Sequence, residues 1–207
     1  MRTINLRRAA PATGALGLVL LAGACGADGG MDHGNMGGST PTSAAAPKSG
    51  ATFNGTDVQF ATDMIPHHRQ ALDMAKAAQA KASTPEVKAL AGKIAKAQEP
   101  EITTMSGWLT AWGEPVPSPG GMNHGDMGAE MPGMMTDQEM QELSKATGTA
   151  FDKMFLRMMI KHHQGAVEMA KTEQAQGQDP AAKKLAGDIA TSQTAEIAEM
   201  QGLLAKL

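Results

Sequence analysis

The sequence predicts an all-α protein, a four-helix bundle formed by two copies of a helical hairpin. Residues 60–109 match residues 155–204 without a gap, at an offset of 95 positions, and about half of the aligned residues are identical. Apolar residues recur at helical spacing in both copies, so each hairpin carries one apolar stripe. Two such hairpins bury their stripes best against each other, and we expect a pseudo-two-fold axis between them. Tyrosine is absent and only 3% of residues are aromatic, so the core must consist of Ala, Leu, Ile and Met.

The N-terminus is typical of a bacterial lipoprotein signal peptide, residues 1–24. Arg2, Arg7 and Arg8 form its positive region, and residues 15–24 form an apolar run that is too short to span a bilayer. The run ends in Leu-Ala-Gly-Ala-Cys, which resembles a lipobox and predicts that Cys25 is the lipid anchor. We therefore expect an exported protein that is lipid-anchored to the cell membrane on its extracytoplasmic side. The alternative is an unmodified cysteine inside the signal.

The charge and composition of the remaining chain restrict its partners. Removing residues 1–24 takes away three arginines and no acid, which leaves 15 basic against 21 acidic residues, a net charge of −6. Such a surface repels phosphate groups, so we expect no nucleic-acid partner and favour a cationic ligand. Residues 25–55 are rich in Gly, Ser, Thr, Ala and Pro and predict a disordered tether.

The folded part, residues 56–207, divides into repeat 1 (56–112), a Met/Gly/Pro-rich loop (113–135) and repeat 2 (136–207). We expect the first helix to begin at an N-cap on Thr56 or Asp57 and the second at Pro85, ending before Gly113. Thr136 with Glu139 predicts a capping box for a short helix that reaches about residue 146. Long helices then follow from about residue 149 to 176 and from residue 180 to the C-terminus.

Each repeat carries a His-His pair, and these pairs predict an inner metal site. A helical wheel puts the histidines on either side of the inward seam, so the two pairs can face each other across the pseudo-dyad. The imidazoles are His67, His68, His162 and His163, and the nearby thioethers are Met64, Met74, Met159 and Met169. Thioethers select soft ions and imidazole suits copper, so this set predicts Cu(I), with Ag(I) as its mimic. The alternative is that the histidines are hydrogen-bonded core residues.

Two glycine-rich boxes contain the remaining histidines of the six in the chain. Two thioethers and one imidazole within six residues let a flexible loop wrap one monovalent copper ion. The predicted ligands are Met31, His33 and Met36 in the first box and Met122, His124 and Met127 in the second. The alternative is a low-complexity segment without a ligand.

Two polar residues and one methionine on the apolar stripe of the second helix of each repeat are candidates to orient the histidines or to add ligands. They are Gln98, Glu101 and Met105 in repeat 1 and Gln193, Glu196 and Met200 in repeat 2. The alternative is a hydrogen bond at the helix interface. If imidazoles bind the ion, we expect binding to weaken as the pH falls through roughly 6.5, because the neutral ring is needed.

The motif Met-Ile-x-His-His-x-x-Ala-x-x-Met-Ala, followed by Gln-x-x-Glu-Ile-x-x-Met, resembles the domain of unknown function 305 family. The resemblance covers residues 57–112 and 137–207. It implies a ferritin-like helical bundle and, from some exported members, a link to copper binding and tolerance. The family motif falls on the His, Met, Gln and Glu positions given above, and Lys161 in place of Pro66 alters no proposed ligand.

These observations favour an anchored extracytoplasmic protein that sequesters or delivers Cu(I), with a copper-handling protein as a possible partner. A non-catalytic envelope interaction module with structural histidines is the alternative. A ferritin-like di-iron oxidase fits less well, because its Glu-x-x-His signature is absent: Met64, Ile65, Met159 and Ile160 stand at the glutamate positions. We also find no nucleophile elbow, phosphate loop or paired acid/base carboxylates, and predict no enzymatic activity.

Overall fold

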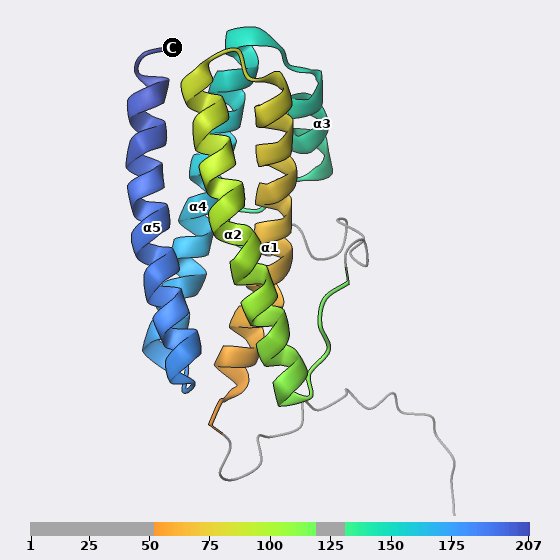
Figure 1. Ribbon diagram of the computed structural model, residues 1–207, viewed down its shortest axis with the longest axis vertical. Helices are drawn as coiled ribbons and strands as arrows, with labels where there is room; N and C mark the ends of the chain where they lie inside the picture. Colours follow the sequence, from red (N-terminus) through yellow and green to blue (C-terminus); the bar gives the residue numbers. More distant parts are fainter. Residues whose placement is uncertain (1–51, 119–130) are drawn as a thin grey trace, which may run out of the picture. The chain divides into compact units, whose positions relative to one another are not determined.

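The computed structural model describes residues 52–118 and 131–207, and within these ranges the chain is all-α, as predicted. Figure 1 shows its five helices: α1 (Gly55–Lys81), α2 (Pro85–Trp112), α3 (Asp137–Lys145), α4 (Gly148–Gln176) and α5 (Pro180–Leu204). None of these helices has the length and apolar character needed to cross a membrane.

The four long helices form two antiparallel hairpins. The helices α1 and α2 pack along each other, as do α4 and α5, and the hairpins meet mainly through α1 and α4 (Figure 1). The helices α2 and α5 touch much less, and the short α3 lies against α4. The crossing of α1 and α4 is therefore the main interface between the two repeats.

The N-cap of the first helix lies two residues before Thr56 and three before Asp57, the predicted positions. It is Asn54, whose side chain accepts hydrogen bonds from Thr56 N and Asp57 N, while the Asp57 carboxylate accepts from Asn54 N. The expectation of a cap at Thr56 or Asp57 is thus wrong, because Asp57 closes the capping box from its N3 position. The capping box of Thr136 and Glu139 at α3 is confirmed.

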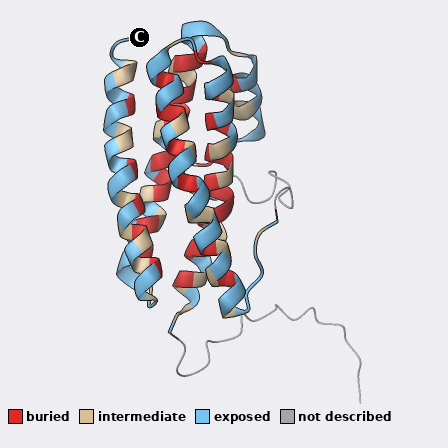
Figure 2. Ribbon diagram, in the orientation of Figure 1, coloured by how far each residue is buried: buried red, intermediate tan, exposed pale blue. Residues whose placement is uncertain are grey.

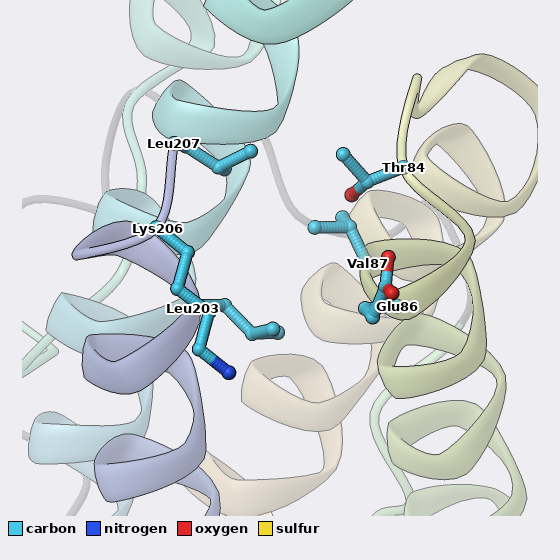
Figure 3. A pocket seen from close by; sticks show the side chains of 6 residues that line it. All are labelled: Thr84, Glu86, Val87, Leu203, Lys206 and Leu207. Atoms are coloured by element: carbon cyan, nitrogen blue, oxygen red, sulfur yellow. The ribbon is translucent and has the colours of Figure 1, made fainter.

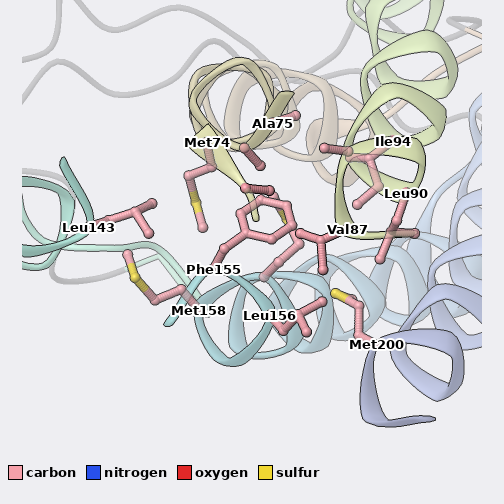
Figure 4. Packing of buried hydrophobic residues seen from close by; sticks show 14 of the residues in the cluster. Met74, Ala75, Val87, Leu90, Ile94, Leu143, Phe155, Leu156, Met158 and Met200 are labelled. Carbon is pink, nitrogen blue, oxygen red and sulfur yellow. The ribbon is translucent and has the colours of Figure 1, made fainter. Parts of the chain in front are cut away.

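Two apolar clusters form the core, and the buried stripes of the helices face inward (Figure 2). The first cluster, part of which is seen in Figure 4, lies beside α3 and includes Ala71, Met74, Ala75, Leu90, Ile94, Leu143, Phe151, Phe155, Leu156, Met159 and Met200. The second cluster includes Phe60, Ala61, Met64, Ile65, Met105, Leu109, Ala166, Ala170, Ala186 and Ile189. Each fully buried Leu, Ile or Phe stabilises the fold by roughly 1.5–3 kcal/mol.

Every long helix passes through both clusters, with polar residues between them. On α1 the second cluster ends at Ile65 and the first begins at Ala71, whereas on α4 the first ends at Met159 and the second begins at Ala166. This reversed order shows that α1 and α4 run in opposite directions. The segments between the clusters form one buried polar layer in the middle of the bundle.

Reciprocal contacts of two equivalent aspartates join the repeats at both ends. Asp57 accepts hydrogen bonds from Gln178 N (3.0 Å) and Asp179 N (2.9 Å) in the turn of repeat 2. Asp152, 95 positions after Asp57, accepts from Ser83 N (2.9 Å) and Thr84 N (3.0 Å) in the turn of repeat 1. Each repeat therefore supplies the carboxylate that closes the other repeat's turn.

One end of this arrangement contains an additional buried acid. Glu173 is fully buried, and its carboxyl group has no hydrogen-bond partner among the described residues apart from the Asp57 carboxylate. A Cβ atom on Gly177 would overlap this carboxyl group and lie 2.5 Å from its Cδ atom. The equivalent residues in repeat 1 are Ala78 and Ala82, so glycine at position 177 supplies the space that the glutamate needs.

Glu173 makes stability depend on pH. Burial, followed by the hydrogen bond and charge of Asp57, raises the pKa of Glu173 from 4.5 to about 8. Burial alone would raise the pKa of Asp57, but the hydrogen bonds it accepts lower it overall. Glu173 therefore carries the proton. Between pH 4.5 and 8 the folded state binds a proton that the unfolded chain does not, so this contribution to stability is complete below pH 4.5 and is lost as the pH rises to 8.

We predict that Glu173→Gln, which keeps the shape and remains neutral, removes this loss. The variant and the parent protein should melt at similar temperatures at pH 5, and the variant should melt higher at pH 9 by more than about 2 °C. Melting curves of both proteins across this range test it, and Glu168→Gln, at an exposed position of α4, is the matched control. A constant difference between parent and Glu173→Gln at all pH values would contradict the assignment.

We also predict that Glu173 and Gly177 are energetically coupled. Gly177→Ala alone should destabilise by about 1–3 kcal/mol, because its methyl group meets the Glu173 carboxyl group although the φ of −64° suits alanine. Adding Glu173→Ala recreates the alanine pair of repeat 1 and should recover most of this loss. Denaturant unfolding of the two single variants and the double variant measures the coupling, and additive effects would refute it.

Candidate metal centre

Two equivalent histidines meet at the centre of the polar layer. The rings of His67 on α1 and His162 on α4 have centroids 3.7 Å apart and planes 36° apart, and both residues are 0% exposed. These residues are separated by the repeat offset of 95, so the contact lies on the pseudo-dyad. The antiparallel crossing of α1 and α4 thus brings the two predicted His-His pairs together.

The other histidine of each pair is held by a glutamate of the neighbouring helix. His68 Nε2 lies 2.7 Å from Glu101 Oε2, and His163 Nε2 lies 2.8 Å from Glu196 Oε2. Both histidines are fully buried, whereas the glutamate side chains are 18% and 12% exposed. The glutamates therefore form the side of the layer that reaches solvent.

The hydrogen bonds leave one nitrogen of each ring available. Carboxylate and carbonyl oxygens only accept, so the Nε2 atoms of His68 and His163 donate to glutamate and that of His67 donates to Pro132 O at 3.1 Å. The Nδ1 atoms of all four rings, and Nε2 of His162, are buried without a partner among the described residues. Amide atoms of Gln98 and Gln193 in the same layer are also unpartnered. Each such group costs about 1–3 kcal/mol when it remains unsatisfied.

Burial keeps the central rings neutral. Burial is the main cause that lowers the pKa of His67 to about 3, and the charge of His68 lowers it further. The hydrogen bond to Pro132 has the opposite effect but is weaker. Burial and then the neighbouring His67 lower the pKa of His162 well below 6.5. The pKa of each of these two rings therefore lies below the value of roughly 6.5 on which the expected pH dependence of binding is based, and that dependence stays a prediction.

The predicted methionines fall into two groups, one near the polar layer and one further along the helices. Met64 and Met159 lie one helical turn before His67 and His162, and Met105 and Met200 lie one turn after Glu101 and Glu196. All four are fully buried at the edges of the two clusters.

Met74 and Met169 lie two turns further along, at a helical rise of about 10 Å from the central rings. Met74 packs in the first cluster near Leu143 and Phe155 (Figure 4). Met169 lines a small surface pocket with Asp63 and Glu173. The structure does not bring these two thioethers into the polar layer.

Several predicted residues lie outside the described residues: Cys25, Met31, His33, Met36, Met122, His124 and Met127. The two described segments beside residues 119–130 are both bound to α1, since Arg69 Nη1 donates to Pro117 O at 2.6 Å and His67 donates to Pro132 O. These contacts are within two residues of the His67-His68 pair.

The donor set of the polar layer fits a soft ion better than a hard one. In the described ranges, no group of three or more His, Cys, Asp or Glu side chains is arranged to hold a metal ion. The unpartnered donors of the layer include imidazole nitrogens, and the thioethers of Met64 and Met159 lie one helical turn before the central rings. Imidazole and thioether are donors that suit a soft ion.

A pocket larger than the one beside Met169 lies at the end of the bundle, away from the histidines of the polar layer. It has a volume of about 200 Å³ and is formed where α2 begins and α5 ends (Figure 3). Its lining residues are Thr84, Glu86, Val87, Leu203, Lys206 and Leu207. Because no histidine lines it, the polar layer remains the candidate centre.

Comparison with known proteins identifies the family. Residues 57–204 match the family described as a domain of unknown function (DUF305). The chain belongs to the DUF305 family. Among curated proteins no sequence matches it.

Solved structures similar to this chain include two DUF305 proteins and CopM. The DUF305 protein from Streptomyces coelicolor is 37% identical over 73% of this chain and 93% of its own, with a TM-score of 0.65. A fragment from Deinococcus radiodurans is 34% identical over 74% of this chain and 98% of its own, with a TM-score of 0.66. CopM in its Cu(II)-bound form is 40% identical over 72% of this chain and 96% of its own, with a TM-score of 0.63. CopM has also been solved in Cu(I)-bound and Ag-bound forms.

Sequence reasoning missed the residues that break the repeat. Gln70 and Gly165 are equivalent, one turn after the central histidines, yet only Gln70 carries a side chain. Ala78 and Glu173 differ in the same way. A position-by-position comparison of the two copies contains this signal, because a buried position filled differently in each copy marks a place where the symmetry ends.

We predict that His67 of the metal-free protein does not titrate between pH 8 and 4 and that the pKa of His162 lies well below its ordinary value, because burial disfavours the charged ring. Imidazole nitrogen chemical shifts measured by NMR on histidine-labelled protein test this. Exposed histidines of an unfolded sample in urea provide the reference titration near pH 6.5. A midpoint above pH 5 for either central ring in the folded protein would contradict the prediction.

Proposed function

We propose that this protein binds copper as Cu(I) in the polar layer and acts in extracytoplasmic copper homeostasis, by sequestering the ion or delivering it to a protein partner. The observation that carries this proposal is the contact of His67 with His162 within a buried layer of four imidazoles. Their Nδ1 atoms have no partner among the described residues, and Met64 and Met159 lie one helical turn before the central rings. The copper-bound and silver-bound forms of the similar protein CopM support it.

Neutral imidazole and thioether together suit a soft monovalent cation. The central rings remain neutral well below pH 6.5, so they can donate a lone pair without first losing a proton. The carboxylates of Glu101 and Glu196 orient the outer rings and make the exposed side of the layer attractive to a cation. We infer that the ion approaches from this side.

The location follows from the N-terminal sequence. We propose that residues 1–24 are a signal peptide, that Cys25 carries the lipid anchor, and that residues 25–55 tether the bundle to the membrane. The Met/His boxes around His33 and His124 then offer the first ligands that an incoming ion meets. In this proposal the protein is a binding protein without catalytic activity.

We predict that His67→Ala/His162→Ala lowers the affinity for Cu(I) at pH 7 at least tenfold. Competition with a chromophoric Cu(I) chelator measures it, and His33→Ala/His124→Ala separates the boxes from the polar layer. Circular dichroism and melting curves must show that each variant is folded. Wild-type affinity no greater than that of a variant lacking all six histidines would refute copper binding by histidine.

An interaction module with structural histidines is the second candidate, and the close ring contact of His67 with His162 favours it. The two candidates differ in how the metal affects stability. If the polar layer binds Ag(I), ligand at 100 times its Kd should stabilise the protein by about 2.7 kcal/mol. No change in melting temperature with Cu(I) or Ag(I) would support the interaction module.

A further inference from the structure

A short segment, residues 131–135, lies across α1 and α4 just before α3, and we name it the strap. Its end is bound by Gln70 on α1, whose Oε1 accepts from Met135 N and whose Nε2 donates to Met135 O, both at 2.8 Å. Gln70 is 5% exposed and Met135 is 1% exposed. A side-chain amide that forms both hydrogen bonds with one residue's backbone fixes that residue's position and orientation.

The other end of the strap packs directly on the backbone of α4. A Cβ atom on Gly165 would overlap the Pro132 carbonyl group and lie 2.7 Å from Gly133 N. Gly133 has a φ of +80°, and a Cβ atom there would lie 2.7 Å from Lys161 O and 2.9 Å from His162 O. Only glycine fits at both positions, so the backbone of the strap is in direct contact with the backbone of α4 beside the histidine layer.

The strap reaches the metal centre through one hydrogen bond. The carbonyl of Pro132, at the end of the strap that packs on Gly165, accepts from Nε2 of His67 at 3.1 Å. This bond places the hydrogen of the neutral ring on Nε2 and leaves the lone pair on Nδ1. The pseudo-dyad provides no counterpart of the Pro132 carbonyl for His162. The ring of His162 lies near the backbone of His67 instead, and neither of its nitrogens forms a hydrogen bond of good geometry with the described residues.

The repeat explains why the strap is bound on one side only. Gln70 and Gly165 are equivalent positions, each three residues after a central histidine. On α1 this position supplies a long amide that holds the strap, and on α4 it supplies the space into which the strap fits. Both the oxygen and the nitrogen of the Gln70 amide are bonded to Met135, so each end of this side chain holds the strap.

We propose that Gln70 is a positioning residue for the metal centre, acting through the strap to hold the Pro132 carbonyl against His67 and to present His67 Nδ1 to the ion. Only the presentation of Nδ1 to the ion rests on the proposed function. The placement of the Pro132 carbonyl against His67 determines the tautomer of His67 in the metal-free protein and does not depend on metal binding. Groups that orient a histidine ligand through its other ring nitrogen commonly change metal affinity by about 10–100-fold.

The test compares two variants that release the strap from opposite sides with matched controls. Gln70→Ala removes the amide, and Gly165→Ala inserts a methyl group at the Pro132 carbonyl. Gln79→Ala, at an exposed glutamine of α1, and Gly92→Ala, at a helical glycine with open space around it, are the controls. The full chain is used, and circular dichroism establishes that each variant is folded.

Three measurements follow on each protein. Without metal, imidazole ¹⁵N shifts should show His67 with its hydrogen on Nε2 in the parent and controls, and a mixture of tautomers in both strap variants. The Met135 amide should exchange with deuterium at least tenfold faster in Gln70→Ala. The affinity for Cu(I), from chelator competition, should fall 10–100-fold in both strap variants.

The outcomes separate this inference from the proposed function. An unchanged His67 tautomer in both strap variants would overturn the inference whatever the affinity does. A changed tautomer with unchanged Cu(I) affinity would overturn the link between the strap and the ion. If the parent protein itself binds no Cu(I), the proposed function fails, and the tautomer and exchange measurements still decide whether Gln70 positions His67.

Discussion

The contact between His67 and His162 is the constraint on which the rest of the bundle depends. Two neutral rings with centroids 3.7 Å apart require α1 and α4 to cross at one register, because a shift of either helix by one residue would rotate its imidazole away from the seam. The reciprocal contacts of Asp57 and Asp152 then close both ends at the same register. The hydrogen bonds of these two aspartates form in only one arrangement of the helices, and they favour it over other packings of similar apolar area.

The polar layer reduces stability and provides the chemistry. Apolar side chains in place of the four histidines, two glutamines and two glutamates of the layer would pack between the clusters and leave no polar atom without a partner. Each buried polar group without a partner costs about 1–3 kcal/mol. The two flanking clusters compensate, since they enclose the layer with fully buried Leu, Ile, Met and Phe residues. The low dielectric environment that they create also keeps His67 and His162 neutral.

The duplicated architecture departs from symmetry at a few positions, and each departure has a local physical cause. The helix α3 and the strap cover one side of the crossing, which requires Gln70 to bind and Gly165 to leave space. At the end of α4, Glu173 occupies the volume that Gly177 vacates, where repeat 1 has two alanines. The repeat therefore determines the arrangement of the four long helices. The difference between Gln70 and Gly165 gives the two central imidazoles different surroundings.

Much of the fold was determined by the sequence alone, because its signals are local. Helical periodicity, Thr136 with Glu139, Pro85, Asp179-Pro180 and the 95-residue repeat act within a few residues or between copies, and they predicted the helices and the pairing of the His-His motifs. The same reasoning placed Met74 and Met169 near the histidines, although the helical rise puts them two turns away. Only the tertiary structure decided which ring nitrogens are bound, that His67 is held by a carbonyl 65 residues away, and that Glu173 faces Asp57. These features depend on distances between segments that are far apart in the chain, and no local pattern specifies such distances.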